Sequence, residues 1–251
     1  MGTKASIAAG FALISSAPSH AQSAIGTPSS ALVAAQSAVC RPQFTVDAKL
    51  HEAGTAFIIA GDRPVLVTAQ HLFGPEGGLK EAIRWQEMPK RASSVSCKQI
   101  KAATRWSTGP AIAVEGAHPM TPEYQSGSVN DVAIFPLVGK VSAASSLTLA
   151  ARAPSVGTKV WLVAQVEGAG QGAPLLHPAT VLGRQNGAML FSYDDPKIDL
   201  DATSGAPIVD ASGKVVGVNL GGGFDPESKA VVGVADDLEV ISKAVAAAKS
   251  G

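Results

Sequence analysis

From residue 41 onward, short apolar runs alternate with clusters of turn-forming residues. Each run has three to seven residues, which suits β-strands and is too short for a typical helix. Turn formers such as Gly61-Asp62-Arg63-Pro64 and Asp210-Ala211-Ser212-Gly213 separate the runs. The expected strands are 55–60, 65–68, 111–115, 132–137, 160–166, 188–192, 207–209, 215–220 and 230–235. Many short strands with frequent turns predict an all-β barrel or sandwich, not a parallel α/β sheet.

One segment, residues 236–249, has helical periodicity. It begins with acidic residues at Asp236 and places Leu238, Ile241 and Val245 on one face. Acids at the start of a helix complement its dipole. We expect a C-terminal amphipathic helix packed on the β domain.

Composition limits the classes of function. The chain has 251 residues, of which 46% are hydrophobic and 16% charged, so it can build one large β domain or two smaller packed units. Lys+Arg and Asp+Glu both count 20, and this balance gives no indication of nucleic acid or an anionic membrane as a partner. The sequence contains no zinc-type Cys/His cluster, phosphate loop or dinucleotide fingerprint, so we expect neither a metal nor a cofactor.

Residues 1–21 have the pattern of a signal peptide. Lys4 is followed by an apolar run at 5–14, and the segment ends in the small residue Ala21. The run is shorter than the roughly 20 residues that span a bilayer, so a retained membrane anchor is the weaker alternative. The mature chain is expected to be secreted or periplasmic. Residues 22–40 are rich in Ala and Ser and carry no charge, which predicts an N-terminal extension or linker.

The chain contains two cysteines, Cys40 and Cys97. Export would place them in an oxidising compartment, where an even count usually forms disulfides. We expect the disulfide between them, and the alternative is two buried free thiols. A bond that closes a loop of this length contributes about 4 kcal/mol in the chain-entropy account.

Three local sequences carry candidate chemistry. His71 ends the second of two apolar runs joined by a turn, so rigid backbone would hold an imidazole at a strand end. Asp131 opens the run at 132–137, where a buried carboxylate needs a donor such as an imidazole N–H. Ser204 precedes Gly205 in a tight turn, which presents a hydroxyl beside backbone N–H groups, as acyl transfer requires. Taken singly, the same residues could be an ordinary surface histidine, a turn-capping aspartate and a plain loop serine.

Together the three segments resemble the chymotrypsin-like serine protease family, especially its compact bacterial members. The resemblance covers roughly residues 54–235 and rests on Thr68-Ala69-Gln70-His71, on Asp131-Val132-Ala133-Ile134-Phe135-Pro136-Leu137, and on Ser204-Gly205-Ala206-Pro207. The chain order His, Asp, Ser matches this family and differs from the orders in subtilisins and α/β-hydrolases.

The resemblance implies the fold and the domain limits. It implies two packed Greek-key β-barrels at about 41–150 and 151–235, followed by the helix at 236–249, within a peptidase domain of 41–251.

The resemblance also implies roles for particular residues. Ser204 would be the nucleophile, His71 the general base and Asp131 the residue that orients the imidazole, in an exported serine endopeptidase that cleaves polypeptides. The backbone N–H groups of Ala202 and Ser204 would form the oxyanion hole.

Substrate-binding positions follow from the same resemblance. Ile198 stands where trypsin-like members carry an Asp, so the primary pocket should not select a basic side chain. The segment Asn219, Leu220, Gly221 and Gly222 would pair with an extended peptide.

Ala202 departs from the family pattern, which usually has glycine there. A Cβ costs roughly 1–2 kcal/mol if this residue takes a positive φ. The alternative function is therefore a catalytically impaired homologue that binds peptides without turnover; an esterase that uses the same nucleophile is a further alternative.

Overall fold

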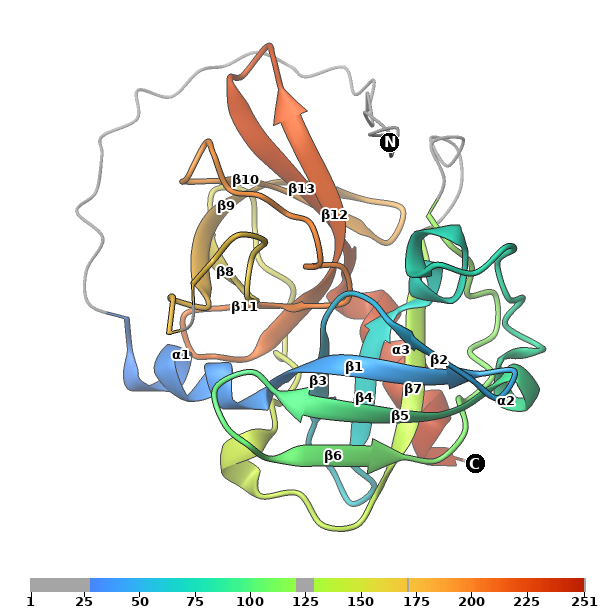
Figure 1. Cartoon of the computed structure of the whole chain (residues 1–251). Helices are drawn as coiled ribbons and strands as arrows, with labels where there is room; N and C mark the ends of the chain where they lie inside the picture. The colour runs from blue at the N-terminus through green and yellow to red at the C-terminus, as the bar shows by residue number, and fades with distance from the viewer. Residues whose placement is uncertain (1–27, 121–128, 171, 251) are drawn as a thin grey trace.

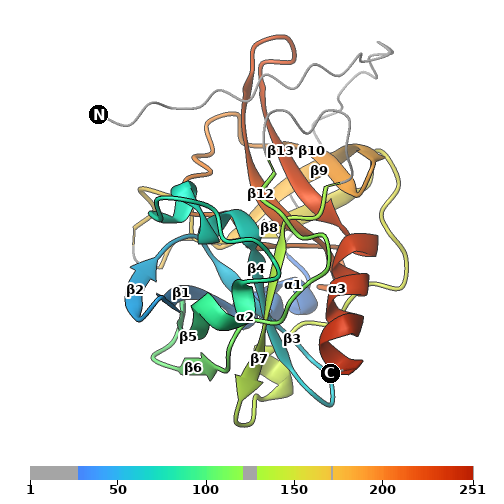
Figure 2. The same ribbon diagram turned by 90° about the vertical axis from the view of Figure 1, so that its right-hand side faces the viewer.

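The computed structural model describes residues 28–120, 129–170 and 172–250, and the expected signal peptide at 1–21 lies outside them. Two β-barrels pack against each other, and the C-terminal helix α3 (Leu238–Ser250) lies along them (Figures 1 and 2). The predicted all-β fold with two barrels and a C-terminal helix is confirmed. Among the described residues, no helix is long and apolar enough to cross a membrane.

The first barrel is built from the N-terminal half of the chain. Its strands are β1 (Val39–Val46), β2 (Lys49–Glu52), β3 (Ala56–Ile59), β4 (Val65–Ala69), β5 (Ala92–Gln99), β6 (Arg105–Thr108) and β7 (Val132–Val138). They are ordered β2-β1-β3-β4-β7-β6-β5, and β1 also pairs with β5. That pairing closes the barrel and leaves β2 as a short extension of the sheet. The short helical segments of this half are α1 (Ser30–Ala35), η1 (Gln36–Ala38), η2 (Gln70–Phe73), η3 (Pro75–Gly77) and α2 (Met88–Arg91).

The second barrel closes in the order β10-β13-β12-β11-β8-β9. The turn η5 (Ala143–Ser145) lies on the connection to it. Its strands are β8 (Lys159–Val163), β9 (Leu176–Gln185), β10 (Ala188–Tyr193), β11 (Pro207–Val209), β12 (Val215–Asp225) and β13 (Ala230–Asp237). Figure 1 shows the hairpin of β12 and β13 extending beyond the rest of this barrel.

Each barrel has its own apolar interior, and a third cluster joins them. Phe44, Phe73 and Phe135 fill the first barrel, and the rings of Phe44 and Phe73 lie 4.7 Å apart in a T-shaped contact. The third cluster takes buried residues from both barrels and from one face of α3, including Ile241 and Val245. The helix therefore fixes the two barrels to each other, and the residues between them are held in place.

The sequence did not predict five of the observed strands, β1, β2, β5, β6 and β9, and three of its expectations differ from the structure. Residues 111–115 form no strand, because Ala111 N–H donates to Ala92 O in β5 and Ile112 N–H to Ile134 O in β7, so the segment pairs along neither strand. Residues 30–38, within the segment expected to be an extension, form α1 and η1 with Leu32 buried, and the expected boundary at 41 falls inside β1. The helix begins at Leu238, and its two expected leading acids end β13 instead.

The expected disulfide is confirmed. Cys40 in β1 and Cys97 in β5 are bonded, with Cα atoms 5.5 Å apart, across the strand pair that closes the first barrel. The bond therefore ties the barrel together at its closing seam.

Removal of this disulfide is expected to lower the free energy of unfolding by about 4 kcal/mol, because 57 residues separate its ends and the open chain gains that loop entropy on unfolding. Urea unfolding of wild type and of Cys40→Ala/Cys97→Ala measures the difference. Dithiothreitol should bring wild type to the midpoint of the double variant and leave the double variant unchanged. Equal midpoints for oxidised wild type and the double variant would contradict the prediction.

Candidate active site

His71 follows β4, a strand whose five residues are all buried. It lies in the 3-10 turn η2 and is itself 4% exposed. The neighbouring Gln70 fixes this turn, since its N–H donates to Asp131 O at 3.0 Å and its Nε2 donates to Ile83 O at 2.9 Å. The turn that carries His71 is therefore held in place by the two hydrogen bonds of Gln70.

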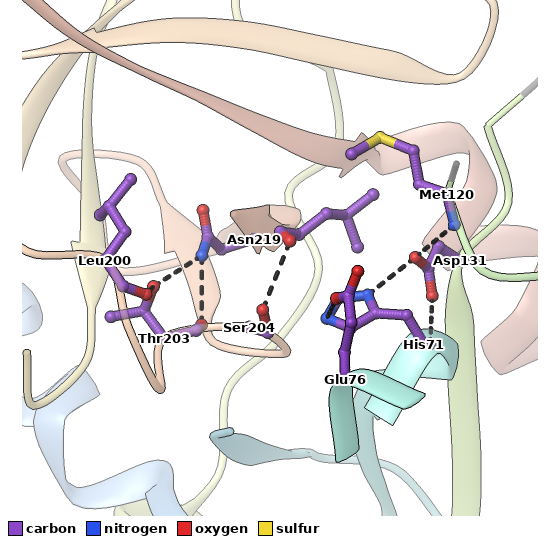
Figure 3. Close-up of polar contacts among 9 residues, drawn as sticks. His71, Glu76, Met120, Asp131, Leu200, Thr203, Ser204 and Asn219 are labelled. Atoms are coloured by element: carbon purple, nitrogen blue, oxygen red, sulfur yellow. Dashed lines mark hydrogen bonds and ion pairs between the residues drawn. The ribbon is translucent and has the colours of Figure 1, made fainter. Parts of the chain in front are cut away.

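The carboxylate of Asp131 is completely buried and accepts three hydrogen bonds (Figure 3). Oδ1 accepts from His71 N–H at 2.7 Å, and Oδ2 lies 2.8 Å from His71 Nδ1 and accepts from Met120 N–H at 2.8 Å. A carboxylate oxygen only accepts, so Nδ1 of a neutral imidazole carries the proton and Nε2 keeps its lone pair. The structure thus brings His71 and Asp131 together with the basic nitrogen of the ring facing away from the acid.

Asp236 supports Asp131 from the second barrel. The backbone N–H of Asp131 donates to both carboxyl oxygens of Asp236, at 3.1 and 3.0 Å. Complete burial raises the pKa of Asp236 well above its usual range, and the charge of Asp131 adds to this effect. Sequence patterning placed Asp236 in the first helical turn; that placement was wrong, and the following Asp237 caps α3 by accepting from Glu239 N–H.

The turn that carries Ser204 packs against the strands that precede His71. Thr55 N–H donates to Ser204 O at 2.8 Å. Gly205 has φ of +83°, and a Cβ there would lie 2.3 Å from both Thr55 O and Thr68 Oγ1. Glycine is required at this position by both conformation and space. The close approach brings the serine of the second barrel to the end of β4, after which His71 follows.

Ala202 adopts a left-handed backbone conformation with φ of +62°. The position where the related family usually has glycine thus takes the glycine-like geometry in spite of its Cβ, at a cost of roughly 1–2 kcal/mol. Within the described ranges, the N–H groups of Ala202 and Ser204 have no protein acceptor. Two backbone donors next to the candidate nucleophile are therefore free to bind an oxygen of another molecule.

Ser204 Oγ and His71 Nε2 are not hydrogen-bonded to each other. Ser204 Oγ donates to Leu220 O at 3.3 Å. In the part of the chain that the structure describes, His71 Nε2 has no hydrogen-bond partner, and it lies 3.5 Å from a carboxylate oxygen of Glu76 in η3 (Figure 3). The hydroxyl must turn away from Leu220 before the imidazole can take its proton.

Burial of the imidazole acts to lower the pKa of His71, but the charge and hydrogen bond of Asp131 and the charge of Glu76 outweigh it. The pKa of His71 therefore lies above its ordinary value. Protonated imidazole cannot act as a base, so activity that depends on His71 should fall as the pH drops through this raised pKa.

Replacement of Glu76 by glutamine should shift the acidic limb of the pH profile of kcat/KM to lower pH. Glu76 favours the imidazolium, and without its charge more of His71 is neutral at pH 6. Because Glu76 is 67% exposed, solvent screens the pair, and we expect a gain at pH 6 of about 1.5- to 5-fold.

The matched control for this variant is Glu87→Gln, which removes an exposed carboxylate that pairs with Arg84. It should leave the profile unchanged. A Glu76→Gln profile identical to wild type, or one shifted to higher pH, would contradict the prediction.

The expected substrate-binding residues lie in different surroundings. Asn219 is completely buried, and its Nδ2 donates to Thr203 O at 3.2 Å, so it supports the serine turn. Ile198 lies in the interior of the second barrel and is 8% exposed. Gly221 and Gly222 lie on the part of β12 that pairs only with β13 among the described strands. Leu220 lies between Asn219 and Gly221, and its carbonyl oxygen accepts from Ser204 Oγ.

Sequence reasoning missed four contributors to this site. Asp236, Met120 and Glu76 contact the imidazole–carboxylate pair, and Arg41 bonds to the serine turn. Asp236 could have been suspected because two adjacent acids followed an apolar strand. The other three carry no local sequence signal, since their contacts depend on how distant segments meet.

Comparisons with known proteins identify the family and the fold. Residues 54–218, more than half of the chain, match the family model of the trypsin-like peptidase domain. No curated protein sequence gives a significant match to the chain.

Solved structures show the same fold at low identity. The active form of the Rv3671c protease from M. tuberculosis is 16% identical, with a TM-score of 0.53 over 92% of this chain and 93% of that one. Kallikrein-related peptidase 10 is 14% identical, with a TM-score of 0.56 over 87% and 98%. The HtrA-type protease AlgW with a tripeptide is 17% identical, with a TM-score of 0.52 over 88% and 62%. The chain belongs to the trypsin-like peptidase family of serine proteases.

Proposed function

We propose that the protein is an exported serine endopeptidase that hydrolyses peptide bonds through an acyl-enzyme, with His71, Asp131 and Ser204 as its triad. The observation that carries this proposal is the 2.8 Å contact between His71 Nδ1 and Asp131 Oδ2. This contact fixes the tautomer in which Nε2 is the base. His71 lies on the turn that follows β4, and the Ser204 turn packs against the strands that precede it.

The first half of the reaction forms the acyl-enzyme. Ser204 Oγ leaves Leu220 O, gives its proton to His71 Nε2 and attacks the scissile carbonyl carbon. The carbonyl oxygen becomes an oxyanion and accepts from the N–H groups of Ala202 and Ser204. His71 then protonates the leaving amine as the C–N bond breaks. Hydrogen bonds of this kind are often long or misaligned without substrate and tighten when it binds, which accounts for the present partner of Ser204.

The second half regenerates the enzyme. Water gives a proton to His71 Nε2 and attacks the acyl carbon, and the same two N–H groups bind the second oxyanion. Ser204 Oγ leaves with the proton from His71, and the carboxylic acid product departs. Asp131 stays ionised throughout and stabilises the imidazolium.

The substrate is proposed to be an extended polypeptide. From Gly221 to Asp225, strand β12 pairs with β13 on one edge, and its other edge pairs with no described strand. A peptide strand can add to such an edge through backbone hydrogen bonds. By the family resemblance, Ile198 stands where trypsin-like members carry an Asp and brings no negative charge there, so a basic side chain should not be selected.

Export is supported by two features. Residues 1–21 have the pattern of a signal peptide, and the Cys40–Cys97 disulfide suits an oxidising compartment. We propose that the mature protein acts outside the cytoplasm, as a secreted or periplasmic enzyme.

The conformation of Ala202 favours turnover over the alternative of a non-catalytic peptide-binding protein. The alternative of an impaired homologue rested on the cost of a positive φ at Ala202, whose Cβ disfavours that conformation. Ala202 nevertheless has a positive φ of +62°, and among the described residues neither candidate oxyanion donor has a protein acceptor.

The direct test is hydrolysis of fluorescein-labelled casein by the oxidised mature chain. The wild type should release fluorescent peptides, phenylmethylsulfonyl fluoride should stop the release, and Ser204→Ala should show none. Ser212→Ala, a change in an exposed turn where the hydroxyl donates to Asp210, is the matched control and should keep full activity. Hydrolysis that survives in Ser204→Ala would overturn the proposal.

A further inference from the structure

Arg41 reaches from the first barrel to the serine turn of the second. It lies in β1 beside the disulfide-bonded Cys40. Its Nη1 donates to Ala202 O at 2.6 Å and to Gly54 O at 2.9 Å, and its Nη2 donates to Gln165 O at 2.6 Å. One side chain thus bonds to three backbone carbonyls from three separate segments, two of them in the second half of the chain.

The peptide that joins residues 202 and 203 is held by the first barrel and by its own turn. Its carbonyl oxygen, Ala202 O, accepts from Arg41 and also from Thr55 Oγ1 at 2.9 Å. On the opposite side of the same peptide, Thr203 N–H donates to Leu200 O at 3.1 Å. The peptide that joins residues 202 and 203 is therefore held at both its oxygen and its nitrogen.

The fixed peptide determines where the Ala202 N–H points. The φ angle of Ala202 rotates the preceding peptide, which carries this N–H, relative to the peptide that Arg41 holds. At +62° alanine is in a conformation that it avoids without support from its surroundings. Any relaxation of φ would turn one of the two candidate oxyanion donors away from Ser204.

The guanidinium is suited to this task by its charge. Arg41 stays protonated at neutral pH, and charge-assisted hydrogen bonds are about twice as strong as neutral ones. Its planar fork can serve several carbonyls at fixed angles, which a lysine ammonium cannot do in the same way.

We propose that Arg41 is a positioning residue that holds Ala202 in its left-handed conformation and thereby orients the Ala202 N–H for the oxyanion. This inference rests on the proposed hydrolytic function. It explains why an alanine can stand where the family usually has glycine: Arg41 and Thr55 supply the constraint that offsets the strain of the Cβ.

Arg41→Met should slow labelling of Ser204 by a fluorophosphonate probe about 5- to 30-fold. Without Arg41, Ala202 can leave its left-handed conformation, and the free-energy cost of restoring that conformation corresponds to this factor in rate. Ala202→Gly should rescue it. Glycine takes positive φ about as readily as negative φ, so the double variant Arg41→Met/Ala202→Gly should label within about twofold of wild type. Rescue by Ala202→Gly is a readout that loss of general packing around Arg41 would not give.

The control is Arg91→Met, which makes the same change at an exposed arginine paired with Asp47. It should be labelled like wild type.

A second test variant is Thr55→Val, which removes the second donor to Ala202 O without loss of volume. It replaces Arg41→Met if that variant does not fold. It should slow labelling by a smaller factor, which Ala202→Gly again restores. Wild-type labelling in both Arg41→Met and Thr55→Val, or failure of Ala202→Gly to rescue either, would overturn the inference.

Thermal unfolding separates failure of this inference from failure of the proposed function. If folded wild type is not labelled at all, the hydrolytic function falls, but the melting temperatures still test Arg41. Ala202→Gly should raise Tm in the presence of Arg41, where the strain is held, and raise it less in the Arg41→Met background, where alanine can relax. Equal rises in both backgrounds would overturn the positioning role.

Discussion

Ser204→Ala, His71→Ala and the double variant are each expected to lower kcat by the same factor, on the order of 10⁶. The serine oxygen is a weak nucleophile until the imidazole removes its proton, and in the acylation step the imidazole acts by activating this oxygen. Loss of either residue therefore removes the whole function of the pair. Burst-phase kinetics with a p-nitrophenyl ester measure the acylation step directly.

This comparison is informative because the two side chains are not hydrogen-bonded to each other in the structure. If Ser204 and His71 act as one unit when substrate binds, the double variant will have the same kcat as each single variant. A double variant with a kcat below that of wild type by the product of the two single losses would show independent roles and contradict the triad. Ser212→Ala serves as the control, since the hydroxyl of Ser212 bonds to Asp210 within an exposed turn.

Asp131→Asn is expected to lower kcat about 10⁴-fold near neutral pH, with little change in KM. The Asp131 carboxylate accepts from His71 N–H, from Met120 N–H and from the ring nitrogen Nδ1. An amide has one accepting oxygen, so its NH2 group would face donors that need an acceptor. The ring would then present Nδ1 as acceptor and Nε2 as N–H, which is the wrong tautomer for a base.

Asp47→Asn provides the matched control, because Asp47 is an exposed carboxylate paired with Arg91 on the same barrel. It should keep full activity. The pH dependence adds a second readout: Asp131→Asn removes the charge that most favours the imidazolium, so the pKa of His71 should fall. A variant with wild-type kcat, or one whose acidic limb moves to higher pH, would contradict the assigned role of Asp131.

The strands that could be predicted from the sequence are those with continuous apolar runs. β4 and β7 lie at the centre of the first sheet and are buried on both faces, so nearly every residue is apolar. β5 was missed because small polar residues and a lysine alternate with its buried positions. β9 was missed because Pro178 and Gly183 interrupt it, and both are tolerated where the strand bends around the barrel.

The candidate site also contains residues that could be predicted from the sequence and residues that could not. His71 and Ser204 are recognisable because their function depends on the residues directly beside them, a strand end and a tight glycine turn. Arg41 meets Ala202 across 161 residues, and Asp131 meets Asp236 across 105. Contacts at such separations follow from how the two barrels pack, and a single sequence gives no information on that packing.

The most direct measurement is mass-spectrometric mapping of a fluorophosphonate adduct on the folded, oxidised mature chain. We expect a single adduct on the peptide that contains Ser204, formed by native protein and absent from heat-unfolded protein, because only the folded chain packs the Ser204 turn against the strands that precede His71. No adduct on natively folded protein, or an adduct on another residue that persists in Ser204→Ala, would contradict the account.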